Sequence, residues 1–194
     1  VFASTCAVYG ETGKETIEED DAADPISYYG MSKWAAEHYI RLFRRLHGLN
    51  YTILRLSNVY GPRQSPHGES GVVAQFCWRI ANGQPLVVNG DGEQTRDFVY
   101  VGDVADAFVA AGRCGECVTL HASTSEAASV NDVVTLLCRL CPTKPETIHG
   151  PERPGEIRHS RLSNKRACKL LGWKPRYSLA EGLKETAAYY FERS

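Results

Sequence analysis

Tyr29 and Lys33 are the two residues whose types and spacing could do chemistry in this 194-residue sequence. They are four positions apart, so on a helix their side chains share one face and can act on one target. A free phenol has a pKa of about 10 and is a poor base at neutral pH, whereas a lysine ammonium nearby lowers that value. Such a pair can exchange a proton with an alcohol or sugar hydroxyl. The same spacing also occurs on ordinary surface helices, so neighbouring stretches must decide between the two interpretations.

The pair must sit on a helix, and the sequence predicts one over residues 27–46, with a proline and a serine at its start and a glycine after its end. Residues 1–3 have the pattern of a strand end, and residues 51–56 that of a second strand. A strand, a helix and a strand in this order imply a right-handed crossover and a parallel sheet. Polar residues follow both strands, at the sheet edge where open α/β folds bind ligands.

The rest of the chain is predicted to continue as a medium-sized α/β protein. The expected helices are 72–81, 102–111, 130–140, 164–171 and 178–191, and the expected strands are 86–88, 94–101 and 118–121. A polar loop over 64–70 is long enough to suggest a function, and a Pro/Gly-rich connection covers 142–154.

The composition is that of a soluble globular protein, with 43% apolar residues, 23% charged residues and a net charge of -1. This charge does not favour nucleic acid as a partner, and no apolar run approaches the ~20 residues that span a bilayer. We therefore expect neither a nucleic-acid nor a membrane partner, and a cytoplasmic location.

Four of the seven cysteines form two CxxC pairs, Cys114 with Cys117 and Cys138 with Cys141. This spacing can indicate a structural zinc site. Cys117 opens an apparent strand, however, and Cys138 lies within the apolar face of a predicted helix. We therefore expect reduced, unpaired thiols and no metal.

Five stretches of the sequence, in this order and spacing, resemble the extended short-chain dehydrogenase/reductase family. Within it, the chain is most similar to NAD-dependent nucleotide-sugar epimerases of the UDP-glucose 4-epimerase type. The stretches are Ser4-Thr5 with Val8-Tyr9-Gly10, then Tyr29–Lys33, Arg55–Arg63, Gly90–Asp103 and Arg153–Glu156. A single one of these motifs is a weak signal, but their combination is specific.

The resemblance implies an α/β fold: the C-terminal part of a doubly wound, Rossmann-type parallel sheet plus a smaller α/β substrate-binding lobe. Residues 1–70, with a return segment at about 94–122, would form the second half of the NAD-binding sheet. Residues 71–93 and 123–194 would form the nucleotide-sugar-binding lobe. The family's GxxGxxG fingerprint does not occur in these residues. We therefore expect the chain to correspond to the C-terminal two-thirds of such an enzyme and to be inactive by itself.

The resemblance also implies catalytic roles. Tyr29 would be the acid/base for the sugar 4-hydroxyl, and Thr5 would hydrogen-bond the same hydroxyl. Lys33 would lower the pKa of the phenol and hold the nicotinamide ribose. The backbone at Ser57 and Val59 would lie beside the nicotinamide. The implied cofactor is NAD, and these residues do not exclude NADP.

A UDP-sugar is the implied substrate. Asn58 would contact its phosphates, and Arg96 and Arg153 would clamp the diphosphate, as guanidinium groups do well. Glu156 would bind a nucleoside ribose hydroxyl. The remaining substrate-binding positions would line the phosphates and the uracil, and these are Val72, Val87, Val88 and Asn89.

Two positions bear on the subclass. Related dehydratases carry an Asp-Glu pair after the hydroxyl residue, where this chain has Cys6 and Ala7, so an epimerase is favoured. A bulky tyrosine restricts related epimerases to unmodified hexoses at the position where this chain has Ser160. The hypothesis is that UDP-GlcNAc and UDP-GalNAc fit as well as UDP-Glc and UDP-Gal.

Several alternatives stay open from the sequence. They are another nucleotide-sugar-modifying enzyme of the same fold (a reductase, decarboxylase or dehydratase), a non-catalytic nucleotide-sugar-binding lobe, and a zinc-stabilised domain. The family also implies a homodimer, formed through the helix that carries Tyr29.

Overall fold

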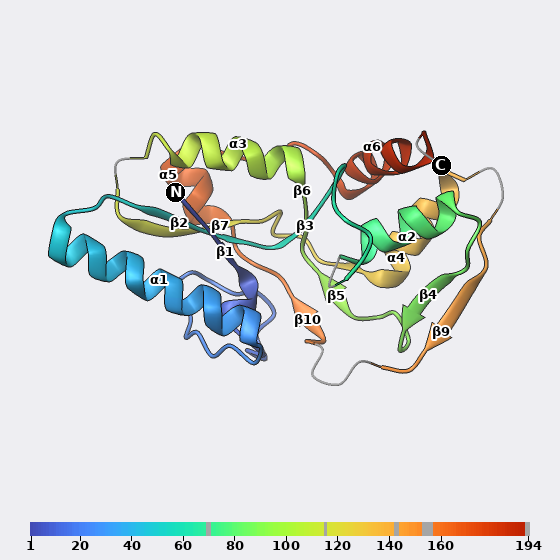
Figure 1. Ribbon diagram of the computed structural model, residues 1–194, viewed down its shortest axis with the longest axis horizontal. Coiled ribbons are helices and arrows are strands. Elements are labelled where there is room, and N and C mark those ends of the chain that lie inside the picture. Colours follow the sequence, from blue (N-terminus) through green and yellow to red (C-terminus); the bar gives the residue numbers. More distant parts are fainter. Residues whose placement is uncertain (69–70, 115, 142–143, 153–156, 193–194) are drawn as a thin grey trace.

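Three parallel strands form the central sheet of the first lobe, at the left of Figure 1. The structure is a computed structural model that describes residues 1–68, 71–114, 116–141, 144–152 and 157–192. The strands are β1 (Phe2–Thr5), β2 (Thr52–Leu56) and β7 (Val118–Ala122), in the order β1-β2-β7. Thr5, Leu56 and Ala122 are in register, so the three carboxyl ends lie level at one edge. The predicted parallel sheet is confirmed.

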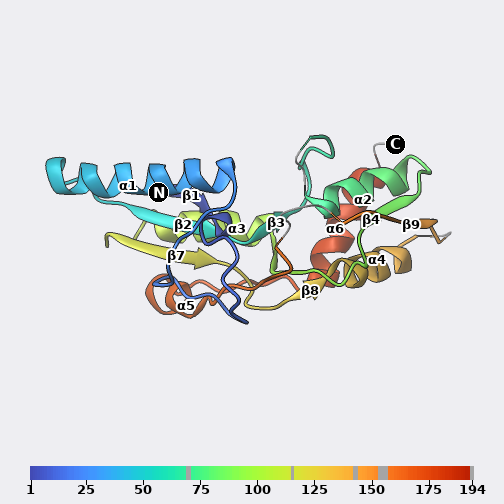
Figure 2. The same ribbon diagram turned by 90° about the horizontal axis from the view of Figure 1, so that it is seen from below.

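Helices cover both faces of this sheet. In Figure 2, α1 (Tyr28–His47) lies on one side of the strands and α5 (Lys165–Leu171) on the other. The core packs β2 and β7 against α5 and α3 (Val101–Ala111), with contributions from Leu54, Ala107, Leu120, Ala167 and Trp173. The crossover predicted between the first two strands is therefore α1, which returns the chain so that β2 pairs in parallel with β1.

Local interactions define the ends of α1. The Ser27 hydroxyl accepts a hydrogen bond from Gly30 N at 3.0 Å, which caps the helix start. At the other end Gly48 adopts a left-handed conformation with φ 72°. The helix predicted from residue 27 to 46 is thus confirmed, with its end one residue later.

Gly30 brings the first turn of α1 against the short 3-10 helix η1 (Cys6–Val8), which directly follows Thr5. A Cβ at this position would lie 2.4 Å from the carbonyl oxygen of Ala7, closer than van der Waals contact permits. The glycine therefore allows the approach that brings the Tyr29 turn beside the Thr5 turn.

The second lobe, at the right of Figure 1, has its own core. It contains α2 (Val72–Ala81), β4 (Leu86–Asn89), α4 (Val130–Arg139), β9 (Thr147–Gly150) and α6 (Leu179–Phe191). Strands β4 and β9 pair in parallel, and the three helices pack together around Phe76, Leu137 and Leu183. Ser129 and Ser178 each begin a helix with a reciprocal capping box.

Short strands connect the lobes, and most of them were not predicted. β3 (Asn58–Tyr60) pairs with β6 (Phe98–Tyr100), while β5 (Thr95–Arg96) lies between β10 (His159–Ser160) and β8 (Ala128–Ser129). The single strand predicted over 94–101 was wrong: it is divided at Asp97, and Val101 already begins α3. The connection predicted over 142–154 contains β9, whose pairing with β4 no local pattern reveals.

No helix in the described part of the chain is long and apolar enough to cross a membrane. All seven cysteines are free thiols. Cys114 and Cys117 lie between α3 and β7 in the first lobe, whereas Cys138 and Cys141 lie at the end of α4 in the second. Among the described residues, no group of three or more His, Cys, Asp or Glu side chains could hold a metal ion.

Candidate functional site

Tyr29 and Lys33 lie on the part of α1 that packs against β1, the strand that ends at Thr5. Lys33 Nζ donates a hydrogen bond of 3.0 Å to the carbonyl oxygen of Ala3, and it lies 5.9 Å from the centroid of the Tyr29 ring. The Tyr29 side chain is 51% exposed, so its phenol is accessible to a ligand. The ammonium is therefore held within electrostatic reach of the ring by the strand backbone.

The Thr5 hydroxyl is buried and oriented. Its oxygen accepts a hydrogen bond of 3.2 Å from Ala7 N, at the start of η1. Because a hydroxyl has one proton to donate as well as lone pairs to accept, this bond leaves the proton for another oxygen. The Cys6 thiol is one neighbour that this hydroxyl faces.

Asp97 connects the strand ends that surround the site. Its fully buried carboxylate accepts hydrogen bonds from Ser57 Oγ at 3.2 Å and from Thr124 N and Oγ1 at 2.9 and 2.8 Å. It also accepts from Ser125 N at 3.0 Å and from Leu162 N at 3.3 Å. Burial raises the pKa of Asp97, and these donors oppose that shift. The Ser57 hydroxyl is therefore occupied, and its backbone N–H is also used, donating to the Ala122 carbonyl at 3.1 Å.

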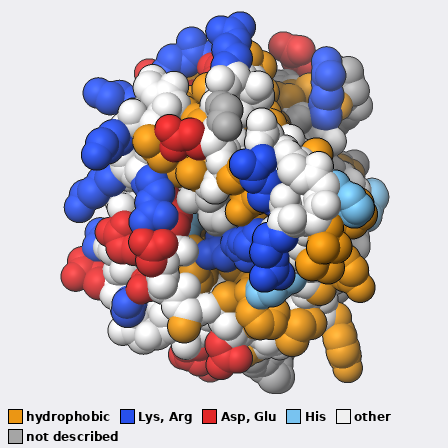
Figure 3. Space-filling model, turned by 90° about the vertical axis from the view of Figure 1, so that its left-hand side faces the viewer, with side chains coloured by type: hydrophobic (Ala, Val, Ile, Leu, Met, Phe, Trp, Pro, Cys, Tyr) orange, Lys and Arg blue, Asp and Glu red, His pale blue; other side chains and the backbone are white. Residues whose placement is uncertain are grey.

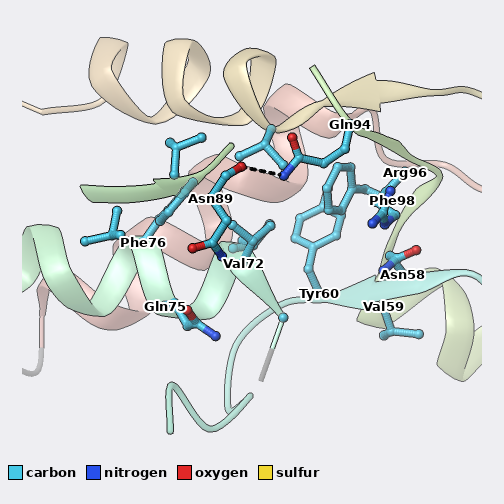
Figure 4. Close-up of a pocket in the computed structure, with 15 residues that line it drawn as sticks. Asn58, Val59, Tyr60, Val72, Gln75, Phe76, Asn89, Gln94, Arg96 and Phe98 are labelled. Atoms are coloured by element: carbon cyan, nitrogen blue, oxygen red, sulfur yellow. Dashed lines mark hydrogen bonds between the residues drawn. The ribbon is translucent and has the colours of Figure 1, made fainter. Parts of the chain in front are cut away.

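A cavity of about 190 Å³ opens between β3, α2, β4 and β5 (Figure 4). Its walls include seven of the residues predicted to bind substrate or cofactor, namely Asn58, Val59, Val72, Val87, Val88, Asn89 and Arg96. Residues from four separate elements thus meet in one pocket of the kind that binds small molecules.

Arg96 provides positive charge at the end of this pocket that faces the first lobe. Figure 4 shows its side chain close to Phe98 and Asn58. Its Nη1 donates to the carbonyl oxygens of Thr95 at 2.8 Å and Arg158 at 3.4 Å, which orients the guanidinium. An arginine held by its own strand in this way is suited to an anionic group such as a phosphate.

Ser160 is buried on β10, where it is the register partner of Arg96 on β5. The hydroxyls of Ser160 and Thr5 both face the Cys6 thiol, whose pKa is raised by burial and by the nearby Asp97 carboxylate. Ser160 therefore lies between the Thr5 turn and the Arg96 end of the pocket. Positions 6 and 7 are occupied by Cys6 and Ala7, so neither of them carries a carboxylate.

Comparison with known proteins places this arrangement in a family. Residues 1–117 match the NAD dependent epimerase/dehydratase family. The chain belongs to that family. It is 39% identical over 189 residues to UDP-glucose 4-epimerase of Mycolicibacterium smegmatis. The matched segment covers 97% of this chain and 60% of that relative. The chain thus spans about 60% of the length of this relative.

Two solved structures of epimerases are similar over nearly the whole chain. UDP-glucose 4-epimerase of Thermotoga maritima with UDP-glucose has a TM-score of 0.95 at 41% identity, over 99% of this chain and 63% of that one. UDP-N-acetylglucosamine 4-epimerase of Methanobrevibacter ruminantium, in complex with UDP-N-acetylmuramic acid, has a TM-score of 0.95 at 30% identity. That match covers 100% of this chain and 63% of the other. The fold is therefore that of Rossmann-type UDP-sugar epimerases.

Two predicted site residues of this epimerase/dehydratase family member, Arg153 and Glu156, lie outside the described residues. The others fall into two groups. Tyr29 and Lys33 lie on α1 beside the strand that ends at Thr5, and the pocket of the second lobe contains the seven residues named above. Ser57 and Ser160 lie between these groups.

The sequence analysis missed Gln94, which also lines the pocket. Its Nε2 donates to the carbonyl oxygen of Asn89 at 3.1 Å, drawn as a dashed line in Figure 4. Its Oε1 is buried, and no described residue donates a hydrogen bond to it. A buried amide acceptor at a cavity wall is suited to a ligand N–H or O–H. The sequence feature that could have indicated Gln94 is its position, as a polar residue between a glycine-containing turn and a strand.

A buried histidine forms a hydrogen-bonded pair with Tyr9, the residue that follows η1. Tyr9 OH and His121 Nε2 are 2.6 Å apart, and His121 Nδ1 lies 2.9 Å from the carbonyl oxygen of Ser163. Because only a protonated Nδ1 can bond that carbonyl, Nε2 of the neutral ring accepts from the phenol. Burial lowers the pKa of His121 to about 4.

This histidine predicts a loss of stability in acid. An unfolded histidine takes up a proton below about pH 6.5, whereas the folded one resists until about pH 4. The neutral His121 therefore contributes fully to the free energy of unfolding above pH 6.5, and this contribution, about 3 kcal/mol at most, is lost as the pH falls toward 4. Urea unfolding from pH 7.5 to 4.5 measures it.

The matched variant is His121→Gln, which does not titrate. We expect it to be less stable at neutral pH but to lose less stability in acid than the parent protein. Burial also raises the pKa values of Glu19 and Asp97, and these act in the opposite direction, so the difference between the two curves isolates the histidine. Parallel curves would contradict the assignment.

Proposed function

We propose that the full-length protein catalyses the NAD-dependent 4-epimerisation of a UDP-hexose. Two observations carry this proposal: α1 holds Tyr29 and Lys33 against the strand that ends at Thr5, and a pocket on the other side of the junction contains Asn58 and Arg96. A proton-transfer group and a pocket with a phosphate-binding cation together match the two ends of a nucleotide sugar. Membership of the NAD dependent epimerase/dehydratase family and similarity to two UDP-sugar epimerases support it.

The residues present fit a nicotinamide cofactor. Lys33 uses one donor on the carbonyl oxygen of Ala3 and has two further N–H donors for ribose hydroxyls. The Ser57 hydroxyl is bonded to Asp97, so we expect the backbone at Ser57 and Val59 to lie beside the nicotinamide ring without using that hydroxyl. NAD held there would supply the hydride acceptor and donor for oxidation and reduction at C4 of the sugar.

Tyr29 takes the proton of the 4-hydroxyl as the C–H bond at C4 is oxidised, and it returns that proton when the carbonyl is reduced. Lys33 places a positive charge 5.9 Å from the centroid of the ring, where it faces the group that exchanges the proton. Thr5 donates its hydroxyl proton to the 4-oxygen in its keto form and so fixes its position. Between the two half-reactions the keto sugar must turn its other face to the cofactor.

We propose that different segments of the chain bind the cofactor and the nucleotide sugar. Residues 1–70 and the return segment 94–122 form the second half of the NAD-binding sheet, and residues 71–93 and 123–194 form the nucleotide-sugar lobe. The two separate hydrophobic cores support this division in outline but correct its bounds. Ala167 of α5 and Trp173 pack in the core of the first lobe, and Tyr60 and Phe98 pack in the core of the second. Arg96 and Asn58 would bind the diphosphate, and the residues from β4 and α2 would enclose the nucleoside, with Arg153 and Glu156 as further contacts.

We also propose that the enzyme accepts N-acetylated hexosamines, UDP-GlcNAc and UDP-GalNAc, as well as UDP-Glc and UDP-Gal. A serine at position 160 leaves space where a tyrosine would project between the Thr5 turn and the pocket. The similar fold of an epimerase named for UDP-N-acetylglucosamine supports this choice.

A homodimer is the proposed assembly. The outward face of α1 exposes six large apolar side chains, and Figure 3 shows hydrophobic side chains gathered on the side where α1 lies. They are Tyr28, Met31, Tyr39, Leu42, Phe43 and Leu46. A contiguous apolar face of this kind marks a protein interface. Sedimentation of the full-length protein as a monomer at micromolar concentration would count against the dimer.

We propose a cytoplasmic location because all seven cysteines are free thiols, which suits a reducing compartment. Recovery of the protein in a secreted fraction after cell fractionation would oppose this.

Replacing Tyr29 by phenylalanine removes the proton-transfer group and keeps the ring. In the full-length protein we expect kcat to fall by about 10²- to 10⁴-fold, since general acid–base catalysis contributes that much. Binding of the UDP-sugar, measured by calorimetry, should change little. The control is Tyr28→Phe at the neighbouring, 98% exposed position, which should behave as the parent protein. A Tyr29→Phe variant with the parent kcat would refute the assignment, and a parent protein that converts no UDP-sugar would refute the proposed function.

Replacing Ser160 by tyrosine tests the sugar class. We expect interconversion of UDP-GlcNAc and UDP-GalNAc to fall at least about 10-fold more than that of UDP-Glc and UDP-Gal, because steric exclusion of a group is worth 1–3 kcal/mol or more. The control is His159→Tyr, which adds the same ring to the exposed neighbour on β10. An equal effect on both substrate pairs would contradict the role of Ser160.

A further inference from the structure

Glu37 has a fully buried carboxylate in the middle of α1. Its Oε1 accepts from Ser4 Oγ at 2.5 Å and Arg55 Nε at 2.9 Å, and its Oε2 accepts from Arg55 Nη2 at 2.7 Å and Arg41 Nη2 at 2.9 Å. Burial alone would raise the pKa of Glu37, but the hydrogen bonds from Arg55 and Ser4 hold it below its usual range. The carboxylate therefore stays ionised and fully hydrogen-bonded inside the lobe.

A gain in the free energy of unfolding does not readily explain a buried carboxylate such as that of Glu37. Removing two charges from water is costly, and replacing a buried ion pair by apolar residues of similar volume is often neutral or stabilising. Arg55 is only 4% exposed, so a second charge of the same cluster has also been removed from water. What an ion pair provides and an apolar contact does not is a fixed direction and register, because the bidentate bonds between Glu37 and Arg55 allow one geometry.

Side-chain hydrogen bonds fix the register between α1 and β1. Lys33 and Glu37 lie one turn apart on α1, and they bond adjacent residues of β1: Lys33 Nζ the Ala3 carbonyl, Glu37 the Ser4 hydroxyl. Tyr29 lies one further turn toward the helix start, and Thr5 is the next residue of the strand. Two bonds therefore determine how far Tyr29 stands from Thr5.

The second strand is tied to the same carboxylate. Arg55 is the register partner of Ser4 on β2, and it precedes Ser57 and Asn58 by two and three residues. Its Nη1 also donates to Tyr9 OH at 2.7 Å, just after η1. One carboxylate thus links the helix that carries the phenol, the strand before Thr5 and the strand before Asn58.

We propose that the Ser4–Glu37–Arg55 cluster consists of positioning residues that set the placement of Tyr29 and Lys33 against Thr5. The inference rests on the proposed function, since it assigns these residues to that reaction. None of the three touches the phenol, so they act through α1 and the sheet. Loss of the cluster should lower kcat much more than it changes KM, because a small misplacement of reacting groups affects mainly the chemical step.

Ser4→Ala in the full-length protein is the first test. It removes the bond between β1 and Glu37 and leaves the Glu37–Arg55 ion pair. We expect kcat to fall by roughly 10-fold with KM within about twofold, as a small displacement would cause. Ser4→Thr keeps a hydroxyl and should retain most of the kcat. The matched control is Thr52→Val, which removes a buried hydroxyl from the other end of the same sheet, where Thr52 Oγ1 bonds the Ala111 carbonyl. It should keep the parent kcat.

Replacing the whole cluster separates positioning from stability. Ser4→Ala, Glu37→Leu and Arg55→Met together leave an apolar contact with no buried charge. We expect a melting temperature near that of the parent protein together with a kcat at least 10-fold lower. A variant of parent-like melting temperature and parent kcat would overturn the inference. If this variant does not fold, the Ser4→Ala comparison decides, and a parent kcat in Ser4→Ala overturns the inference in the same way.

Amide hydrogen exchange tests the inference without reference to the reaction. In Ser4→Ala, exchange over residues 28–35 should become faster at unchanged melting temperature, and Thr52→Val should leave that segment as in the parent protein. Unchanged exchange in Ser4→Ala overturns the positioning role even if the parent enzyme is active. If the parent protein converts no UDP-sugar, the proposed function fails, and the exchange result still shows whether the cluster fixes α1.

Discussion

The buried carboxylate of Asp97 is the interaction on which the junction of the two lobes depends. It sits between β5 and β6 and accepts hydrogen bonds from the end of β2, from the turn after β7 and from the chain after β10. An unpaired carboxylate at that depth would be strongly disfavoured, so the donors and the acceptor must be present together. The three segments are consequently placed by one group, and that group directly precedes Phe98 and follows Arg96, both at the wall of the pocket.

The two lobes are held together by different kinds of contact. The first lobe holds its polar side chains by buried hydrogen bonds and ion pairs around Arg55, Tyr9 and His121, which suits groups that must keep a fixed distance. The second lobe is held by an apolar core with capped helices, and its pocket is lined by valines and aromatic rings with a few amides. Buried polar contacts thus surround the end of β1 and the start of β2, and a mainly apolar wall surrounds the pocket of the second lobe.

The sequence predicted what local interactions determine. The helix over Tyr28–His47 was predictable because Ser27 caps it and a glycine follows it, and α2, α4 and α6 likewise carry their own end signals. β3, β8 and β10 are too short for any two-residue periodicity, and they exist because distant segments pair across the junction. Tyr29 and Arg96 were found through motifs. Glu37 was missed because a glutamate in a helix is usually solvated, and only the fold shows that its face is turned inward.

Strands β10 and β5 meet through only two residue pairs, and one of these couples Ser160 to Arg96. The position that would admit or exclude a sugar substituent therefore shares a backbone ladder with the guanidinium that would hold the phosphates. For protein engineering this means that sugar preference and anchoring strength are not independent variables. Substitutions at 160 that displace the strand would also move the anchor, so selections for new substrates should diversify both positions in one library.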